Sequence, residues 1–262
     1  MGKYDGYLIC TDFDGTLAKE AKISEENRAA IREFMDGGGL FTIASGRSPD
    51  FLIEKTADLP VNAPLLALNG GAITDPRTGK ILRRATLDDG AVTALNTIVR
   101  MIPTIDGVHL IYRDGENFDI LRLTAGVDLC TEAILSGTGR ELYKFLLVFK
   151  EPEHTLAAEQ ACKTLFGSKY VFERSWPHGL EMIPPDGGKG NGVRALRELC
   201  GDKVRCIIGA GDYENDISLI EAADIGCAVA NAIDAVKAAA DRVTQADCGA
   251  AIAEIIHSLP AL

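Results

Sequence analysis

The chain has 262 residues, of which 47% are hydrophobic and 25% charged, and its formal net charge is −11 at pH 7. This balance is typical of a folded globular protein and excludes a disordered chain, and no apolar run approaches the roughly 18 residues of a membrane helix. An acidic chain without a basic stripe is also not a nucleic-acid binder. A small anionic substrate remains compatible with it, provided that cationic groups or a metal are concentrated at the site.

The first part of the chain alternates short apolar strands with amphipathic helices. Ser24 is a suitable N-cap, and three glycines end the helix that it begins; Ser48 and Pro49 have the pattern of a second helix start. Because strand, helix and strand follow one another so closely, the strands are expected to be parallel. The predicted elements are strands at 7–11, 40–44 and 65–68 and helices at 25–36 and from 48 onward.

The last part of the chain repeats this alternation. Helices are expected at 192–200, 216–223, 232–240 and 250–259, and strands at 204–209, 225–229 and 242–244. Together the two ends predict an α/β fold, a doubly wound and mostly parallel sheet with helices on both faces. They form one domain, 1–85 and 183–262.

The middle of the chain has a different pattern. After a turn at 75–79, it contains paired short strands beside helices, which predicts an inserted α+β domain over 86–182 with an antiparallel sheet. The expected helices are 88–101, 128–136 and 153–166, and the expected strands are 107–113, 117–121, 143–149, 170–174 and 179–183.

Seven cysteines are widely spaced, with no C-x-x-C pair, and the four histidines form no pair at ligand spacing. This pattern indicates reduced thiols that pack as small hydrophobic groups rather than a disulfide framework or a zinc site. We therefore expect a cytoplasmic protein.

Carboxylates follow two of the predicted core strands. Asp12 and Asp14 follow the first strand, with Gly15 allowing a sharp turn, and Asp212 and Asp216 follow the strand at 204–209. Taken alone, the first motif has an acidic surface turn as its alternative, and the second has a glycine-rich loop whose Asn or Asp caps the next helix. If the two strands are neighbours, however, the four carboxylates converge at the sheet edge where α/β proteins bind ligands. Oxygen ligands without Cys or His favour Mg²⁺ over Zn²⁺.

Cationic and polar residues occupy corresponding places. Ser45 and Arg47 follow the second strand, Asn69 follows the third, and Lys189 lies in a glycine-rich stretch just ahead of a helix. Each has an ordinary alternative as a turn or a solvated loop residue. Independent surface turns would not need to share one edge of the sheet, so their common position favours a site.

The ordered set of motifs resembles the haloacid dehalogenase superfamily. The matching features are the Asp-x-Asp-Gly-Thr motif at 12–16, Ser45, Lys189 and the Gly-Asp-x-x-x-Asp motif at 211–216, and the Ser-Gly-Arg and Asn-Gly-Gly sequences resemble the Cof-type branch with its inserted cap. The approach to Lys189, Pro184–Gly192, is longer and richer in glycine than is usual in that branch.

The resemblance implies hydrolysis of a small phosphate ester, such as a sugar phosphate, through an aspartyl-phosphate. Asp12 would be the nucleophile and Asp14 the general acid and base. The metal, Mg²⁺, would be bound by the Asp12 carboxylate, the Asp14 main-chain carbonyl and Asp212, with Asp216 holding its waters. Lys189 would neutralise charge, and Ser45 and Asn69 would bind phosphoryl oxygens.

The roles of two residues stay open at this stage. Arg47 is expected to bind substrate or to hold the cap. Asn215 is expected either to cap the next helix or to contact the substrate.

Other functions are compatible with the same motifs. A phosphosugar mutase or phosphotransferase would pass the phosphoryl group to a second hydroxyl instead of to water. A non-catalytic phosphometabolite-binding protein would not need Asp12 and Asp14, and a protein-interaction module has only the large insert in its favour. The sequence is silent on oligomeric state.

Overall fold

The structure is a computed structural model and describes residues 2–59, 61–124 and 140–261. The chain divides into two compact units. The core unit comprises Met1–Arg84 and Gly188–Leu262, and the insert unit comprises Ala85–Gly187. The predicted insert, 86–182, lies within the insert unit.

A parallel sheet lies at the centre of the core unit. In its described residues, the strand order is β15-β14-β13-β1-β4, and every neighbouring pair is parallel. Its strands are β1 (Tyr7–Thr11), β4 (Leu40–Ile43), β13 (Cys206–Gly211), β14 (Ile225–Ala228) and β15 (Arg242–Val243). The first motif and the 211–216 motif therefore follow adjacent strands, β1 and β13.

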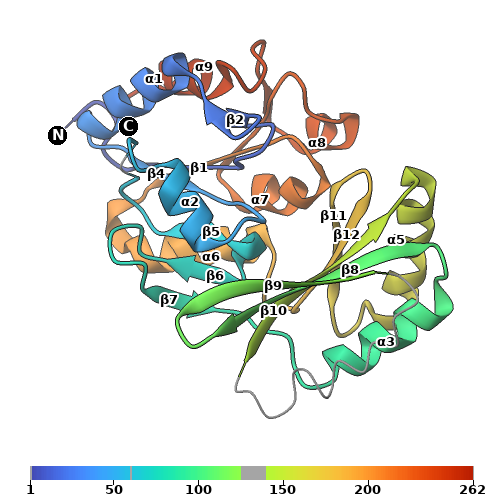
Figure 1. The fold of residues 1–262 in the computed structure, drawn as a ribbon. Coiled ribbons are helices and arrows are strands. Elements are labelled where there is room, and N and C mark those ends of the chain that lie inside the picture. Colours follow the sequence, from blue (N-terminus) through green and yellow to red (C-terminus); the bar gives the residue numbers. More distant parts are fainter. Residues whose placement is uncertain (1, 60, 125–139, 262) are drawn as a thin grey trace. The chain divides into compact units, whose positions relative to one another are not determined.

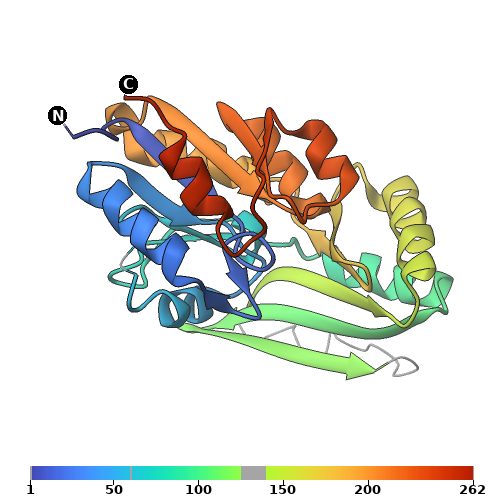
Figure 2. The same cartoon turned by 90° about the horizontal axis from the view of Figure 1, so that it is seen from above.

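Helices cover both faces of this sheet, with α1 and α9 side by side on one face and α6 and α7 on the other (Figures 1 and 2). The side chains of β1 alternate between the two faces, and Leu8 and Cys10 pack with Leu196 of α6 and Leu219 of α7. The helices are α1 (Glu25–Asp36), α2 (Pro49–Lys55), α6 (Lys189–Cys200), α7 (Ile217–Ala222), α8 (Asp234–Ala239) and α9 (Ala251–His257).

Smaller elements complete the core unit. The predicted third strand is β5 (Leu65–Ala67), which joins β4 through a single parallel bridge, between Ala44 and Leu66. Its main partner is the antiparallel strand that follows it in the chain, β6, which in turn pairs with β7. The remaining elements are β2 (Ala18–Lys19), β3 (Lys22–Ile23), β6 (Ala72–Thr74), β7 (Ile81–Arg84) and the 3₁₀ turns η1 (Leu68–Gly70), η2 (Gly201–Lys203) and η3 (Glu214–Asp216).

The insert unit contains an antiparallel sheet in the order β11-β12-β10-β8-β9. One face packs against both helices of its described part, in a single core that includes Leu95, Phe145, Cys162 and Met182. Its elements are α3 (Ala91–Met101), β8 (Ile105–Asp114), β9 (Asn117–Thr124), β10 (Glu141–Phe149), α5 (Pro152–Phe166), β11 (Val171–Trp176) and β12 (Gly179–Ile183).

The predicted fold class, a doubly wound and mostly parallel α/β sheet with an inserted α+β part, is confirmed. The helix expected at 128–136 falls outside the described residues. The strand predicted at 117–121 continues to Thr124, because Leu121 and Leu123 pack against the core of the insert unit.

Candidate active site

The first motif begins where β1 ends. Asp12 continues the sheet, its backbone N–H donating to the carbonyl of Ala210, and its side chain is only 8% exposed. Gly15 then has a φ of 89°, and a Cβ there would lie 2.6 Å from Oδ2 of Asp212. Glycine is therefore needed both for the turn and for the close approach of the two motifs.

The start of α6 departs from the sequence prediction. The helix was expected from Gly192, but it begins at Lys189 and runs through the glycines. A Cβ on Gly190 would lie 2.5 Å from the carbonyl of Ser218 on α7, and one on Gly192 would lie 2.8 Å from Leu66. These glycines allow close packing of α6, and this packing fixes Lys189 in the first helical position.

Lys189 is fully buried and joins the two acidic motifs. Its Nζ lies 2.6 Å from Oδ1 of Asp12 and 2.5 Å from Oδ1 of Asp216. Burial by itself lowers the pKa of Lys189, but the two carboxylates outweigh it and hold the pKa above the ordinary lysine value. Lys189 is therefore a fixed positive charge in the site.

Burial also acts on the carboxylates. It raises the pKa of Asp12, with further increases from the neighbouring Asp216 and Asp212, despite Lys189. Burial and Asp216 raise the pKa of Asp212 to about 6. Carboxylates crowded in this way favour an additional cation.

The same three aspartates form a possible cation site. One oxygen from each of Asp12, Asp212 and Asp216 lies within 4.8 Å of the others. Asp216 uses Oδ1 for Lys189 and Oδ2 for the backbone N–H groups of residues 212 and 213. Asp212 accepts from Thr16 through Oδ1, and Asp12 uses Oδ1 for Lys189. Within the described part of the chain, the structure shows no hydrogen bond to Oδ2 of Asp12 or Asp212, so the donor set fits a hard cation.

The loops after β4 and β5 are tied together through their backbones. The N–H of Ser45 donates to Leu66, the N–H of Asn69 donates to Ser45, and the N–H of Leu68 donates to Arg47. Asn69 is buried with φ 53° and ψ 45°, a left-handed conformation that Asn tolerates better than most residues. Ser45 and Asn69 are thus held beside each other at the sheet edge that carries Asp12.

Arg47 pairs with Asp14. Its Nε lies 2.9 Å from Oδ2 and its Nη2 lies 3.2 Å from Oδ1 of that carboxylate. These hydrogen bonds raise the pKa of Arg47. Asp14 lies outside the three-aspartate group, and its side chain is 42% exposed. A role toward Asp14 is thus a third possible role of Arg47, besides the substrate binding and the cap contact expected from the sequence.

Asn215 is buried inside η3, and no side-chain cap is present at the start of α7, which Asp216 precedes. The interpretation of Asn215 as a helix cap is therefore wrong. Sequence reasoning also missed the contact of Thr16 with Asp212, although Thr16 belongs to the first motif. The motif indicates that Thr16 is near the site, but Asp212, to which Thr16 donates, lies 196 residues further along the chain.

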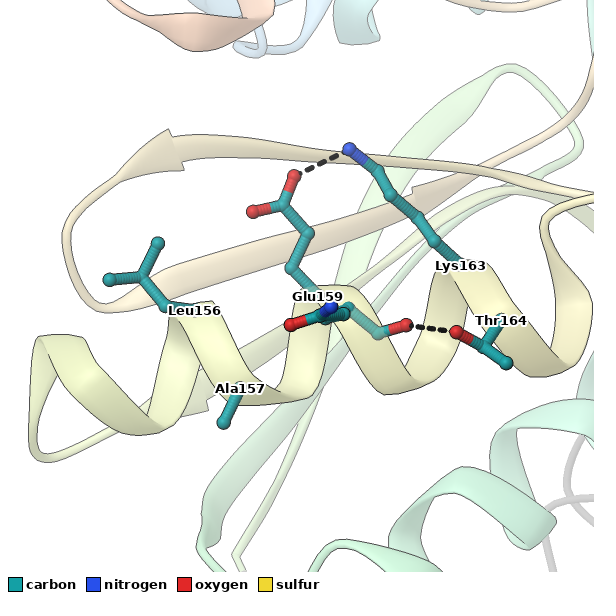
Figure 3. A pocket seen from close by; sticks show the side chains of 6 residues that line it. Leu156, Ala157, Glu159, Lys163 and Thr164 are labelled. Atoms are coloured by element: carbon teal, nitrogen blue, oxygen red, sulfur yellow. Dashed lines mark hydrogen bonds and ion pairs between the residues drawn. The ribbon is translucent and has the colours of Figure 1, made fainter.

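A hollow on α5 of the insert unit contains none of the predicted site residues (Figure 3). Its polar side chains already have partners in the insert unit: Glu159 pairs with Lys163 at 2.6 Å and with Arg174 of β11 at 3.0 Å, and the hydroxyl of Thr164 donates to the carbonyl of Gln160. This surface offers neither a nucleophile nor a phosphate-binding group comparable to those of the core unit.

Comparisons with known proteins show the family of this chain. Residues 9–256 match the family model of the haloacid dehalogenase-like hydrolases. The 5-amino-6-(5-phospho-D-ribitylamino)uracil phosphatase YwtE of Bacillus subtilis (strain 168) is 30% identical over 286 aligned positions, which cover 96% of this chain and 97% of YwtE. The chain belongs to the haloacid dehalogenase-like hydrolase family.

Two solved structures have a similar fold. A haloacid dehalogenase-like hydrolase from B. subtilis has a TM-score of 0.83 at 19% identity and covers 96% of this chain and 99% of its own. A sugar phosphatase of HAD subclass IIB has a TM-score of 0.75 at 19% identity, with coverages of 95% and 97%. The predicted Cof-type branch and the predicted phosphatase class are both confirmed.

Among the described helices, none has the length and apolar character that crossing a bilayer requires.

Proposed function

We propose that this phosphatase is Mg²⁺-dependent and hydrolyses a small phosphorylated metabolite through an aspartyl-phosphate on Asp12. The observation that carries the proposal is the buried Lys189 between Asp12 and Asp216, beside carboxylate oxygens of Asp12 and Asp212 that are open to a cation. An anionic nucleophile meets a phosphate dianion only where positive charge is concentrated. This arrangement supplies that charge in a chain whose net charge is −11.

The metal would be held by Oδ2 of Asp12 and Asp212 and by the main-chain carbonyl of Asp14. When bound, Mg²⁺ supplies charge neutralisation at the phosphoryl group. Asp216 bonds to Lys189 and to the backbone of its own loop, which suits a supporting role that includes contact with metal-bound water.

The remaining steps use residues of this chain. The Asp12 carboxylate attacks phosphorus, and the bond from phosphorus to the leaving oxygen breaks. Asp14 gives that oxygen a proton, then takes one from the water that hydrolyses the aspartyl-phosphate, which restores both carboxyl groups. The Ser45 hydroxyl and the Asn69 amide would donate to phosphoryl oxygens, and the buried Asn215 would support substrate binding from η3.

The substrate class is a sugar phosphate or a similar phosphomonoester. The phosphoribityl compound that the name of YwtE specifies is a reasonable first member of a test panel. We propose that the protein acts in the cytoplasm, because the six cysteines in the described ranges are all free thiols.

The test is a hydrolysis screen over phosphorylated sugars, nucleotides and cofactor phosphates, with release of inorganic phosphate as the readout. We expect phosphate release from at least one class of sugar phosphate. Transfer of the phosphoryl group to a second sugar hydroxyl, without phosphate release, would contradict the hydrolase and favour a mutase or phosphotransferase.

Metal removal gives the first specific prediction. Chelation with EDTA should abolish hydrolysis, and Mg²⁺ should restore it, because the proposed ligands are all oxygen atoms in a net negative site. Addition of Mg²⁺ to the chelated protein should also raise its melting temperature, since a ligand that binds only the folded state stabilises it. Full activity after thorough chelation would exclude the proposed site.

The insert unit gives the second prediction. All nine predicted site residues lie in the core unit, which has its own apolar core. Replacement of Ala85–Gly187 by a short Gly/Ser bridge should leave a foldable core unit with slow activity on para-nitrophenyl phosphate and no discrimination among natural esters. Circular dichroism would check folding, and an unchanged substrate ranking would show that the insert does not select.

A further inference from the structure

The Arg47–Asp14 pair is the strongest feature of the site that the proposed mechanism has not used. Arg47 approaches both carboxylate oxygens, Oδ2 through Nε at 2.9 Å and Oδ1 through Nη2 at 3.2 Å. A guanidinium group in this two-point arrangement fixes the plane of a carboxylate as well as its position. It therefore restricts where the Asp14 side chain can deliver a proton.

The surroundings of Arg47 hold it in this position. Its backbone N–H donates to the hydroxyl of Ser45 at 3.2 Å, and its carbonyl accepts from Leu68 at 2.9 Å. Its guanidinium carbon lies 4.9 Å from the centre of the Phe51 ring, and Phe51 packs edge-on against Phe13 at 5.8 Å. Phe13 lies between Asp12 and Asp14 in the sequence. Arg47 is therefore connected to the first motif twice, directly through Asp14 and indirectly through Phe51 and Phe13.

Stability does not explain the pair. The side chains of Arg47 and Asp14 are 51% and 42% exposed, and ion pairs at this exposure contribute little to folding. A direct role in holding phosphate would require the guanidinium to turn toward the substrate, yet two of its N–H groups are committed to Asp14. The contacts of this arginine are those of a group that orients another side chain.

We propose that Arg47 is a positioning residue that orients Asp14 for proton transfer, an inference that rests on the proposed function. The shorter contact, from Nε to Oδ2, anchors the carboxylate, and the longer one leaves Oδ1 as the oxygen that carries the proton. In the first step the proton leaves Oδ1 for the leaving oxygen, and Asp14 becomes the carboxylate that Arg47 stabilises. In the second step Oδ1 takes the proton of the attacking water.

The proposal predicts a dependence on the leaving group. An alcohol is a poor leaving group and needs the proton from Asp14, whereas nitrophenolate does not. Because a misplacement of about 1 Å can cost about 10²-fold in rate, Arg47→Ala should lower kcat/KM for glycerol phosphate by about 10- to 100-fold. The burst of nitrophenolate from para-nitrophenyl phosphate should change by less than about threefold, since phosphorylation of Asp12 then needs no acid.

A double-mutant cycle separates this role from direct phosphate binding. Arg47→Ala, Asp14→Asn and the double variant are compared on glycerol phosphate with Mg²⁺ present. If Arg47 acts only through Asp14, it should add less than about twofold in the Asp14→Asn background. Arg47→Lys, which retains charge but not the two-point contact, should recover only part of the loss.

Arg197→Ala is the matched control. Arg197 pairs with Asp224 at 2.6 Å, with side-chain exposures of 43% and 41%, and it lies in the last turn of α6, whereas Lys189 is the first residue of that helix. It should have wild-type kinetics. Inhibition by inorganic phosphate should also be equal in wild type and Arg47→Ala, because the arginine is not proposed to hold the phosphoryl group.

The possible outcomes distinguish the inference from the function on which it rests. Normal turnover of glycerol phosphate by Asp14→Asn would refute the acid–base assignment itself. A slow Asp14→Asn enzyme, with equal losses from Arg47→Ala in both backgrounds or with weaker phosphate inhibition, would keep that assignment and overturn the positioning role.

Discussion

An Asp12→Asn variant is expected to lose hydrolysis of every phosphate ester by at least about 10³-fold, because the amide is not a nucleophile and no aspartyl-phosphate can form. The fold should persist. The amide has nearly the volume of the carboxylate, and its oxygen can still accept from Lys189, whose Nζ lies 2.6 Å from Oδ1 in the wild-type protein. Rapid quench followed by intact-mass measurement would look for the added phosphoryl group.

Asp14→Asn is the matched control for this experiment. It keeps the main-chain carbonyl that we assign to the metal and removes only the proton-transfer carboxyl. With para-nitrophenyl phosphate it should give a burst and a trapped phosphoenzyme, followed by slow turnover, because acid–base help is worth about 10²–10⁴-fold. A phosphorylated Asp12→Asn protein would show that the nucleophile has been assigned to the wrong residue.

A Lys189→Met variant is expected to lose both activity and stability. Lys189 is fully buried between Asp12 and Asp216, and its removal would leave two carboxylates in the interior without their cation. Breaking such a buried pair costs about 3–5 kcal/mol in the free energy of unfolding. Urea denaturation of the metal-free protein would measure the loss.

Two comparisons test whether the loss of stability comes from the uncompensated buried carboxylates. Mg²⁺ should restore part of the stability of Lys189→Met, because it supplies positive charge to the same carboxylates. Lys163→Met, which removes the half-exposed lysine from its ion pair with Glu159 on α5 and leaves Glu159 paired with Arg174, should change the free energy of unfolding by about 1 kcal/mol or less. Equal stability of Lys189→Met and wild type would contradict the buried charge balance described above.

The sequence alone was sufficient to predict the class of fold and the edge of the sheet at which we propose the site. Strand and helix signals depend on local spacing, which a sequence displays directly. Parallel strands connected through helices end at a common edge, so the sequence pattern alone predicts that Asp12, Ser45 and Asp212 lie near one another. The motif resemblance then supplied the reaction class.

The sequence predicted the boundaries of helices and strands, and their pairing, less well. The helix was expected from Gly192, whereas α6 begins at Lys189, and its close contacts with Ser218 and Leu66 require glycine at positions 190 and 192 inside the helix. The strand β5 was expected in the parallel sheet, but it hydrogen-bonds mainly with β6. In both cases the deciding partner is another segment of the chain.

Only the tertiary structure decided which charged groups pair. Lys189 meets Asp12 across 177 positions and Asp216 across 27, and Arg47 meets Asp14 across 33. The sequence offered each of these side chains several possible partners, including solvent. The energy of an ion pair depends on distance and burial, and both are properties of the packed chain rather than of its local pattern.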